Sequence, residues 1–444
     1  MDLLKTKSLR SYHFNGSDNS LKGLLPNWSE DLLSYGVEFD TTNSSPMLTR
    51  IGNSDLHRSL PIHSLMRGCL IDDTGKVVKY LEPSSWEAEV RDGSLGQVMV
   101  EIPEHYEKFE TEGTRCRVKF SMFDIPGFHK VKKFYVSAYE ASLQRSTLKL
   151  ASVKNTSTDY RGGNNNAEYD DTYRSFLGRP VTSTSRINFR KYARNRNLAS
   201  TEWNALTYEA YKTIFWLYYI EYANRNCQLP VNSEKDVNGF AQGGIGNGVT
   251  DFSSSTWSEF NGYNPFVPCG VSDSLGNSSG EVAYDIIGAD NSVIKTVKVP
   301  RYRGIENPFG HIWKWVDGVN VQIEPGEDGK SYVWVCKDPS KFSDTGYQDY
   351  DKVGEEARTS GYVKNIIFGE HGDVVASEVG GGTTTGWCDY HYTSLPTSAA
   401  SLRGLLFGGH AHHGAIAGFA FSLSNNVPSN SYAYVGSRLC FIPR

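Results

Sequence analysis

Three histidines near the carboxyl end form the densest group of side chains that could do chemistry. They lie in Gly408-Gly-His-Ala-His-His-Gly414, where His410, His412 and His413 fall within four residues. Neutral imidazole is a common ligand for Zn²⁺, so a metal site is one interpretation. However, no fourth ligand stands at a defined spacing, and the neighbouring residues are glycine and alanine. We therefore expect a contact surface that carries histidines, with no metal and no cofactor.

Other patterns that could support catalysis lack the context that the chemistry needs. Gly276-Asn-Ser-Ser-Gly280 has the spacing of a nucleophile elbow, which needs a strand before it and a helix after it. Here a polar stretch precedes the pattern and a strand-like run follows it. The glycine-rich segment 239–248 lacks the Lys-Ser/Thr ending of a phosphate-binding loop. We therefore expect no catalytic residues.

The seven cysteines are odd in number, and no two of them form a C-x-x-C pair. This spacing favours free buried thiols over a disulfide framework or a zinc site. The first ten residues are not followed by an apolar run, and no stretch approaches the roughly 18 apolar residues that span a bilayer. These features predict synthesis in a reducing cytosol and a chain that is not a membrane protein.

The charge balance argues against a nucleic-acid partner. The chain has 444 residues, with 50 acidic and 45 basic side chains and a formal net charge of −5. A general nucleic-acid-binding protein would show a basic excess. The 26 tyrosines outnumber the 21 phenylalanines, and tyrosine suits rigid amphipathic contact surfaces.

The elements that must position these residues change in character along the chain. Residues 1–55 are polar and irregular, which predicts an arm that orders on a partner; a frayed terminus is the alternative. From residue 56 to about 150, short runs of β-formers such as Gln97–Ile102 lie between turn residues. The turn Thr111-Glu-Gly-Thr114 predicts a hairpin.

Two helices are expected after residue 180. The first spans about 183–196. The second spans about 201–224, with Ser200 as its N-cap and one buried stripe formed by Trp203, Leu206, Ala210, Ile214, Leu217 and Ile220. After residue 230 the pattern predicts short strands and long loops, a hairpin around Gly288-Ala-Asp-Asn291, and no further helix. The predicted fold class is α+β.

Two segments resemble the formylglycine-generating-enzyme branch of the C-type lectin fold. They are Glu306-Asn-Pro-Phe-Gly-His-Ile-Trp-Lys-Trp315 and the ending from residue 402 to residue 441. The resemblance covers roughly residues 180–444, and it implies a C-type-lectin-like domain with Trp313 and Trp315 in its core. Cys440 is alone in its segment and Cys388 stands apart, so the chain departs from the paired cysteines that oxidative chemistry would need.

A wider similarity extends over most of the chain. Residues 36–42, 50–53, 60–64, 135–141 and 302–315 and the C-terminal stretch resemble the variable proteins of diversity-generating retroelements. They are also similar to virion fibre proteins of phages that infect gut Bacteroidales (crAss-like phages). The resemblance implies a head or tail fibre protein, made in the host cytoplasm and carried on the virion. It also implies a homotrimer, docked to other virion proteins through the N-terminal arm, that binds a host surface glycan or outer-membrane protein.

The last segment alternates small residues with bulky ones, as expected of a glycine-punctuated frame that displays side chains. The predicted ligand-binding residues are His410, His412, His413, Ile416, Phe419, Phe421, Leu423, Tyr432 and Tyr434.

The sequence thus predicts an arm (1–55), a β-rich assembly domain (56–180) and a C-type-lectin-like receptor-binding domain (181–444). The predicted function is adhesion of a virion to its host, without enzymatic activity. Two alternatives stay open. One is a purely structural capsid or tail decoration protein, and the other is an enzyme of the formylglycine-generating type or another hydrolase on that scaffold.

Overall fold

One antiparallel sheet joins the first half of the chain to its last residues. The computed structural model describes residues 29–444, and within them six strands lie in the order β12-β25-β9-β5-β3-β4. Their bounds are β3 (Arg67–Ile71), β4 (Val77–Tyr80), β5 (Gln97–Ile102), β9 (Phe134–Ser137), β12 (Trp203–Ala205) and β25 (Leu439–Phe441). The boundary predicted between residues 180 and 181 therefore does not separate two sheets, because β25 pairs with β9, which lies before the boundary, as well as with β12, which lies after it.

A second, five-stranded sheet corrects the expectation for the N-terminal segment. Its order is β2-β1-β7-β6-β8, with β1 (Ser34–Asp40), β2 (Thr49–Gly52), β6 (His105–Glu112), β7 (Arg115–Ser121) and β8 (His129–Val131). The predicted arm is wrong over residues 34–52, because Tyr35, Val37 and Phe39 alternate into the core of this sheet. Residues 1–28 of that arm lie outside the described residues. The predicted hairpin at Thr111 to Thr114 is confirmed by the pairing of β6 with β7.

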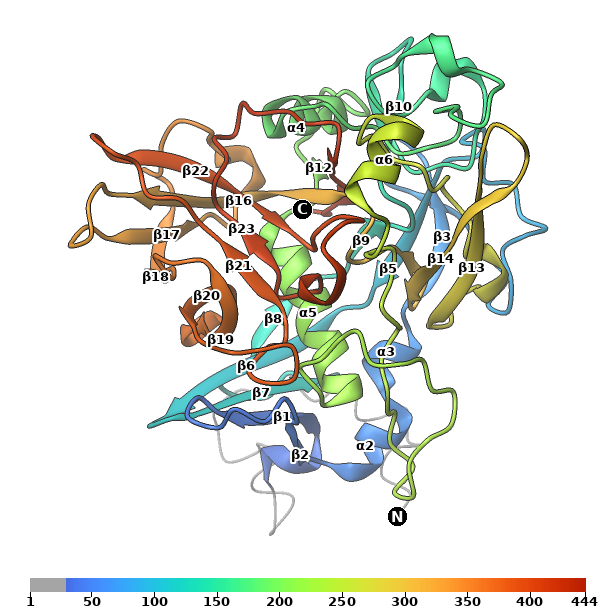
Figure 1. Cartoon of the computed structure of the whole chain (residues 1–444). Helices are drawn as coiled ribbons and strands as arrows, with labels where there is room; N and C mark the ends of the chain where they lie inside the picture. Colours follow the sequence, from blue (N-terminus) through green and yellow to red (C-terminus); the bar gives the residue numbers. More distant parts are fainter. Residues whose placement is uncertain (1–28) are drawn as a thin grey trace.

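The last third of the chain builds the largest sheet, drawn at the left of Figure 1. Its strand order is β18-β17-β16-β22-β23-β21-β19-β20, and β24 pairs with β16. The strands are β16 (Trp313–Ile323), β17 (Ser331–Val335), β18 (Asp351–Glu355), β19 (Gly361–Phe368), β20 (Asp373–Val379), β21 (Tyr390–Tyr392), β22 (Ser401–Phe407), β23 (Ser422–Leu423) and β24 (Val435–Gly436). Trp313 and Trp315 are 1% and 0% exposed, which confirms their predicted place in the core.

Smaller elements complete the molecule. The hairpin predicted around Gly288 is confirmed by β13 (Gly280–Ile287) and β14 (Val293–Tyr302), which β15 (Ile305–Glu306) extends. A two-stranded sheet pairs β10 (Ser142–Gln144) with β11 (Lys149–Ala151). The short helices are α2 (Ser54–Ser59), α3 (Pro61–Ser64), η2 (Glu30–Leu32), η3 (Thr158–Tyr160), η4 (Ala167–Tyr169), η5 (Asp273–Leu275), η6 (Pro339–Lys341), η7 (Gly369–His371) and η8 (Gly414–Ile416). The chain is thus α+β, as predicted.

Three helix predictions need correction or refinement. Helix α4 (Arg186–Arg194) lies inside the predicted range, but the second helix, α5 (Tyr208–Tyr222), begins seven residues after the predicted Thr201. Thr207 caps α5, because its side chain accepts a hydrogen bond from the Ala210 amide, and Trp203 belongs instead to β12. Helix α6 (Ser254–Asn261) contradicts the expectation of no helix after residue 230. It is only eight residues long and is anchored by the buried Trp257 and Phe260, so its periodic signal is weak.

Helix α5 is buried on all sides and not along one stripe. Every residue of α5 except Glu209 is buried. The ring of Trp216 lies 6.4 Å from Phe39 of β1 and 5.7 Å from Phe368 of β19, while the ring of Tyr211 lies 4.5 Å from Phe407 of β22 (centroid distances). The helix therefore fills the space between the five-stranded sheet and the nine-stranded sheet, as Figure 1 shows at its centre.

A buried ion cluster holds α4 against β16. Arg190 donates from Nη2 to Asp317 Oδ1 at 2.7 Å, and Arg186 donates from Nη2 to Asn320 Oδ1 at 2.7 Å. Burial alone would raise the pKa of Asp317, but the hydrogen bonds and charge of Arg190 outweigh it and hold the pKa below its ordinary value. Asp344 accepts further hydrogen bonds from both arginines. The cluster fixes the helix to the strand that carries Trp313 and Trp315.

Two predictions about the whole chain can be compared with the structure. All seven cysteines are free and buried, as predicted. Among residues 29–444, no helix combines the length and apolar character needed to cross a membrane.

The ion cluster generates a stability prediction. Asp317→Ala should lower the free energy of unfolding by about 3–5 kcal/mol, because it leaves two buried guanidinium groups without a central partner. Urea denaturation followed by fluorescence measures the change. The control is Asp349→Ala, which removes the exposed pair of Asp349 with Lys341 and should cost less than about 1 kcal/mol. Equal losses in the two variants would contradict the importance of the buried cluster.

Candidate binding surface

The nine residues predicted to bind a ligand lie close together, but they divide into two groups by exposure. His412 is exposed, and His410, His413, Ile416, Leu423, Tyr432 and Tyr434 are half-buried. Phe419 and Phe421 are 1% and 0% exposed, so the prediction that their side chains protrude from the surface is wrong. The segment from Ala417 to Phe421 turns inward as a unit, because Ala417 and Ala420 are buried as well.

The two phenylalanines have structural partners that the sequence does not indicate. Phe419 packs against Tyr218 of α5, with ring centroids 4.7 Å apart. Phe421 packs against Trp313 at 4.6 Å and lies beneath His413 at 4.8 Å. Phe419 therefore belongs to the central core, and Phe421 together with Trp313 forms a buried base under the histidine segment.

The histidines of this segment hold one another through their rings and backbone. The rings of His410 and His413 lie 3.8 Å apart, and His410 also lies 5.0 Å from Trp257 of α6. The His410 amide donates to Nδ1 of His413 at 2.9 Å, and the His412 amide donates to Nδ1 of His410 at 3.2 Å. Two imidazole nitrogens are therefore already used as acceptors. In the described part of the chain, no group of three or more His, Cys, Asp or Glu side chains has an arrangement that could hold a metal ion.

The charge state of the histidines follows from their burial. Burial lowers the pKa of His413 to about 3, and it lowers the pKa of His410 well below its ordinary value. Both rings are consequently neutral at physiological pH, and they offer flat aromatic area with a polar edge and no positive charge.

Three tyrosines that we did not predict lie beside the histidines. In β21, Tyr390 and Tyr392 are half-buried on one face of the strand while His391 between them is buried on the other. The rings of Tyr390 and Tyr392 lie 4.8 Å apart, and Tyr362 of β19 lies 5.2 Å from Tyr390. The alternation Tyr390-His391-Tyr392 is the signal in the sequence that could have indicated the two tyrosines of β21.

Together these residues form one surface feature, which we call the aromatic band. Tyr392 joins it to the histidines, because its ring lies 6.2 Å from that of His413. At the other end, Tyr434 lies 5.2 Å from His410 and stacks on Tyr432 at 5.3 Å. In the order in which neighbouring rings contact one another, the aromatic band consists of Tyr362, Tyr390, Tyr392, His413, His410, Tyr434 and Tyr432.

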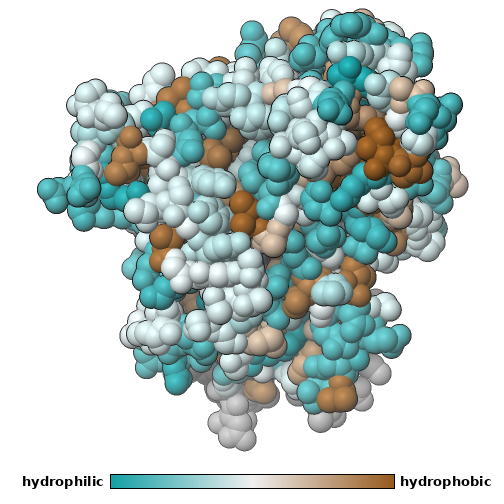
Figure 2. Space-filling view, in the orientation of Figure 1, coloured by the Kyte–Doolittle hydropathy of each residue, from teal (hydrophilic) through white to brown (hydrophobic). Residues whose placement is uncertain are grey.

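The surface around the aromatic band is not strongly hydrophobic. Figure 2 shows the area over β21 and β23 as mostly white and teal, with only small brown patches. The exposed aromatic area is thus carried by amphipathic side chains, whose hydroxyl and imidazole groups can form hydrogen bonds while their rings stack. This arrangement suits the binding of a ligand with both polar and apolar faces.

A polar layer beneath β21 positions the band from below. His391 contacts Ser422 Oγ through Nδ1 at 2.9 Å and the carbonyl oxygen of Ala357 through Nε2 at 3.1 Å. Burial lowers the pKa of His391 to about 4. Glu356 accepts a hydrogen bond from Ser424 Oγ at 2.8 Å, and burial raises its pKa to about 8. Both groups are therefore neutral near pH 7, which removes most of the cost of burying them.

Comparison with known proteins leaves the chain without an assigned family. No family model matches it, and no curated protein matches it. Among solved structures, PvdO from Pseudomonas aeruginosa is similar at a TM-score of 0.34 and 11% identity, over 82% of this chain and 99% of PvdO. The U1 variant of the Major Tropism Determinant is similar at a TM-score of 0.27 and 13% identity, over 85% of this chain and 72% of that protein. The I1 variant of the Major Tropism Determinant is similar at a TM-score of 0.24 and 12% identity, over 93% of this chain and 84% of that protein. At these TM-scores, no property of these proteins is carried over to this chain.

The division into base and band generates a stability prediction. Phe421→Ala should lower the free energy of unfolding by about 3–5 kcal/mol, because it empties space beside Trp313. Tyr432→Ala should lower it by less than about 1 kcal/mol, because Tyr432 is half-buried at the edge of the core and its ring stacks on that of Tyr434. Chemical denaturation of both variants measures the difference. Similar losses would show that Tyr432 is part of the core.

The layer beneath β21 generates a pH prediction. Glu356 keeps its proton in the folded state up to about pH 8, whereas the unfolded chain releases it near pH 4.5. Its contribution to stability is therefore present below about pH 4.5 and is lost as the pH rises through 8. Glu356→Gln should make the urea midpoint depend less on pH between about 5 and 8. The neighbouring exposed residue provides the control, since Glu355→Gln should leave the slope of the parent protein unchanged.

Proposed function

We propose that this chain is a non-enzymatic virion protein of a phage, a head or tail fibre subunit, that adheres to the host surface through the aromatic band. The observation that carries the proposal is the row of seven neutral rings, half-exposed and in contact with one another above a buried aromatic base. The resemblance of the sequence to phage fibre proteins supplies the biological setting.

Tyrosine and histidine offer large, rigid contact area, and they lose little conformational entropy on binding because few of their bonds rotate. In the aromatic band this loss is smaller still, because each ring already rests on a neighbour. A surface that is preorganised in this way favours binding. Aromatic rings stack on the apolar faces of sugars, so a host surface glycan is the ligand that the band suits best.

The position of the band in the fold is compatible with variation. Its members come from β19 and β21 and from the two loops that precede and follow β23, whereas Trp313, Phe421 and Ala417 below them are buried. Substitution of a half-exposed ring leaves this base in place. A homotrimeric fibre present in many copies would raise overall attachment by about 10²–10⁴ through avidity, so weak individual sites suffice. The segment 1–28, with part of the predicted docking arm, lies outside the described residues.

The environment of the thiols supports a non-enzymatic role. Burial raises the pKa of Cys388 and of Cys440 to about 12. Both thiols therefore stay protonated at neutral pH, whereas nucleophilic and metal-binding chemistry needs the thiolate. The proposal accordingly favours adhesion over an enzyme of the formylglycine-generating type.

Binding to host cells tests the proposal. The double variant Tyr390→Ala/Tyr392→Ala should reduce retention of the purified protein on host cells by at least about tenfold, because it removes the centre of the band. Tyr80→Ala is the matched control, since Tyr80 of β4 is 38% exposed but lies outside the band. Circular dichroism confirms that each variant is folded.

The outcomes separate the candidate functions. Loss of binding with the double variant alone, and competition by polysaccharide released from the host, support a glycan-binding fibre. Competition only by outer-membrane protein would replace the glycan with a protein receptor. Unchanged retention of the double variant would overturn the band as the contact surface and favour a decoration protein.

A further inference from the structure

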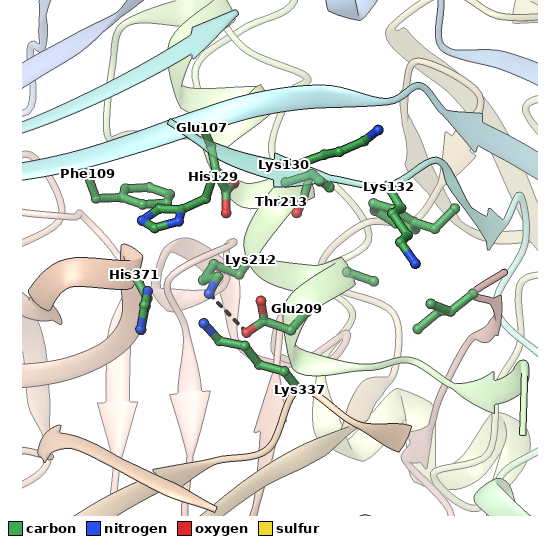
Figure 3. Close-up of a pocket in the computed structure, with 14 residues that line it drawn as sticks. Glu107, Phe109, His129, Lys130, Lys132, Glu209, Lys212, Thr213, Lys337 and His371 are labelled. Atoms are coloured by element: carbon green, nitrogen blue, oxygen red, sulfur yellow. Dashed lines mark hydrogen bonds and ion pairs between the residues drawn. The ribbon is translucent and has the colours of Figure 1, made fainter. Parts of the chain in front are cut away.

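A pocket of about 380 Å³ lies apart from the aromatic band, where several elements meet around the first half of α5. Its walls come from β6, β8, α5, the segment after β17 and η7, and Figure 3 shows Glu209, Lys212, Lys337 and His371 near one another. The volume falls in the range that proteins use for small-molecule ligands. Among its polar lining residues are Glu107, His129, Lys132, Lys212, Lys337 and His371.

The mouth of the pocket carries uncompensated positive charge. Lys132 and Lys337 line the pocket and are exposed, and neither takes part in an ion pair within residues 29–444. His129 and His371 approach each other from β8 and η7, with ring centroids 6.1 Å apart. In Figure 3, the Lys337 side chain extends toward Lys212 and His371. These donors face a common space and therefore favour an anion there.

The deeper end of the pocket offers further donors. Lys212 is 2% exposed, and its Nζ pairs with Glu209 Oε1 at 2.9 Å. An ammonium group has three donors, and this is the one hydrogen bond of Lys212 within the described chain. The acidic charge of Glu209 is thus neutralised inside the site, while Lys212 keeps donors that a ligand oxygen could use.

Glu107 is the feature that points to a missing ligand. The residue is 8% exposed, and its Oε2 atom is buried without a hydrogen-bond partner in the part of the chain that the structure describes. Leaving such an atom unpaired is costly unless a ligand or solvent reaches it. Burial raises the pKa of Glu107 to about 7, so the carboxyl group holds a proton below neutral pH and can then donate it to a ligand oxygen.

We propose that this pocket binds a small organic anion that carries one carboxylate or phosphate group on a polar body of about the size of a sugar ring. Lys337 and Lys132 attract the anionic group at the mouth, and Lys212 and the protonated Glu107 donate to ligand oxygens inside. The site is independent of the aromatic band and gives the protein a second ligand.

The affinity of the pocket for an anion should fall as the pH rises. The groups that face Glu107 are Lys212 and Glu209 of α5, Lys337, Asp373 of β20, His129 and His371. As the pH rises through about 7, Glu107 ionises, loses its donor and repels the anion, so affinity should fall. Deprotonation of His371, whose pKa is lowered by burial, acts in the same direction, so a variant is needed to separate the contributions.

Calorimetric titration of the full chain tests the proposal with three probes: glucose 6-phosphate, glucuronate and glucose. We expect at least one of the two charged sugars to bind near pH 6 and glucose not to bind, and the stronger of the charged sugars identifies the anionic group. Lys337→Gln should weaken binding roughly tenfold. Lys330→Gln is the matched control, because Lys330 is an exposed lysine that pairs with Glu355 away from the pocket.

Glu107→Gln keeps the shape and the donor but cannot ionise. It should bind near pH 6 and lose most of the weakening that the parent protein shows between about pH 6 and pH 8. Absence of binding of both charged sugars at millimolar concentration would overturn the proposal, as would equal binding of glucose or unchanged affinity in Lys337→Gln. A pH dependence that persists fully in Glu107→Gln would remove Glu107 from the site. Thermal unfolding of each variant verifies that the protein is intact.

Discussion

A helix without a polar face must be covered on every side, and α5 imposes this requirement on the whole molecule. Trp216 contacts the five-stranded sheet through Phe39, and Tyr211 contacts the nine-stranded sheet through Phe407. The third direction is closed by Tyr302 of β14, whose ring lies 5.2 Å from that of Tyr218. Trp216 Nε1 donates to the carbonyl oxygen of Gly372 at 2.7 Å, and the Tyr218 hydroxyl donates to the carbonyl oxygen of Cys227 at 3.1 Å. The sheets therefore all pack against one buried helix, α5.

The aromatic band and the pocket depend on α5 in different ways. Phe419 packs on α5 and holds the inward turn that places the histidine segment over Trp313 and Phe421. The pocket uses the polar first turn of α5, where Glu209 is the one residue of the helix that is not buried. Many proteins place ligand-binding side chains at the edges of a rigid scaffold. The packed core fixes the positions of these side chains, and the edge leaves them accessible to a ligand.

Local patterns in the sequence predicted the elements whose partners are close in the chain. The hairpins β6–β7 and β13–β14 have a turn signal between two β-rich runs, and both are present. The pattern predicts a helix over β12, whose partner β25 lies more than 200 residues away. It predicts an arm over β1, which pairs with the nearby β2 but also with the distant β7. The same limit applies to the site. The alternation of small and bulky residues does not separate exposed from buried side chains, because tertiary packing decides that Phe421 faces inward while Tyr392 remains half-exposed.

Because β25 belongs to the six-stranded sheet, the last residues of the chain are needed to complete that sheet. Arg438, just before this strand, is buried and donates to the carbonyl oxygens of Ser137 and Asn307, at 3.1 and 2.7 Å. The strand therefore locks together parts of the chain that are translated early and late. A frameshift or stop codon within residues 408–435 would delete both the arginine and the strand, and the sheet would stay incomplete. Formation of the complete sheet therefore requires that the reading frame be kept through residues 408–435.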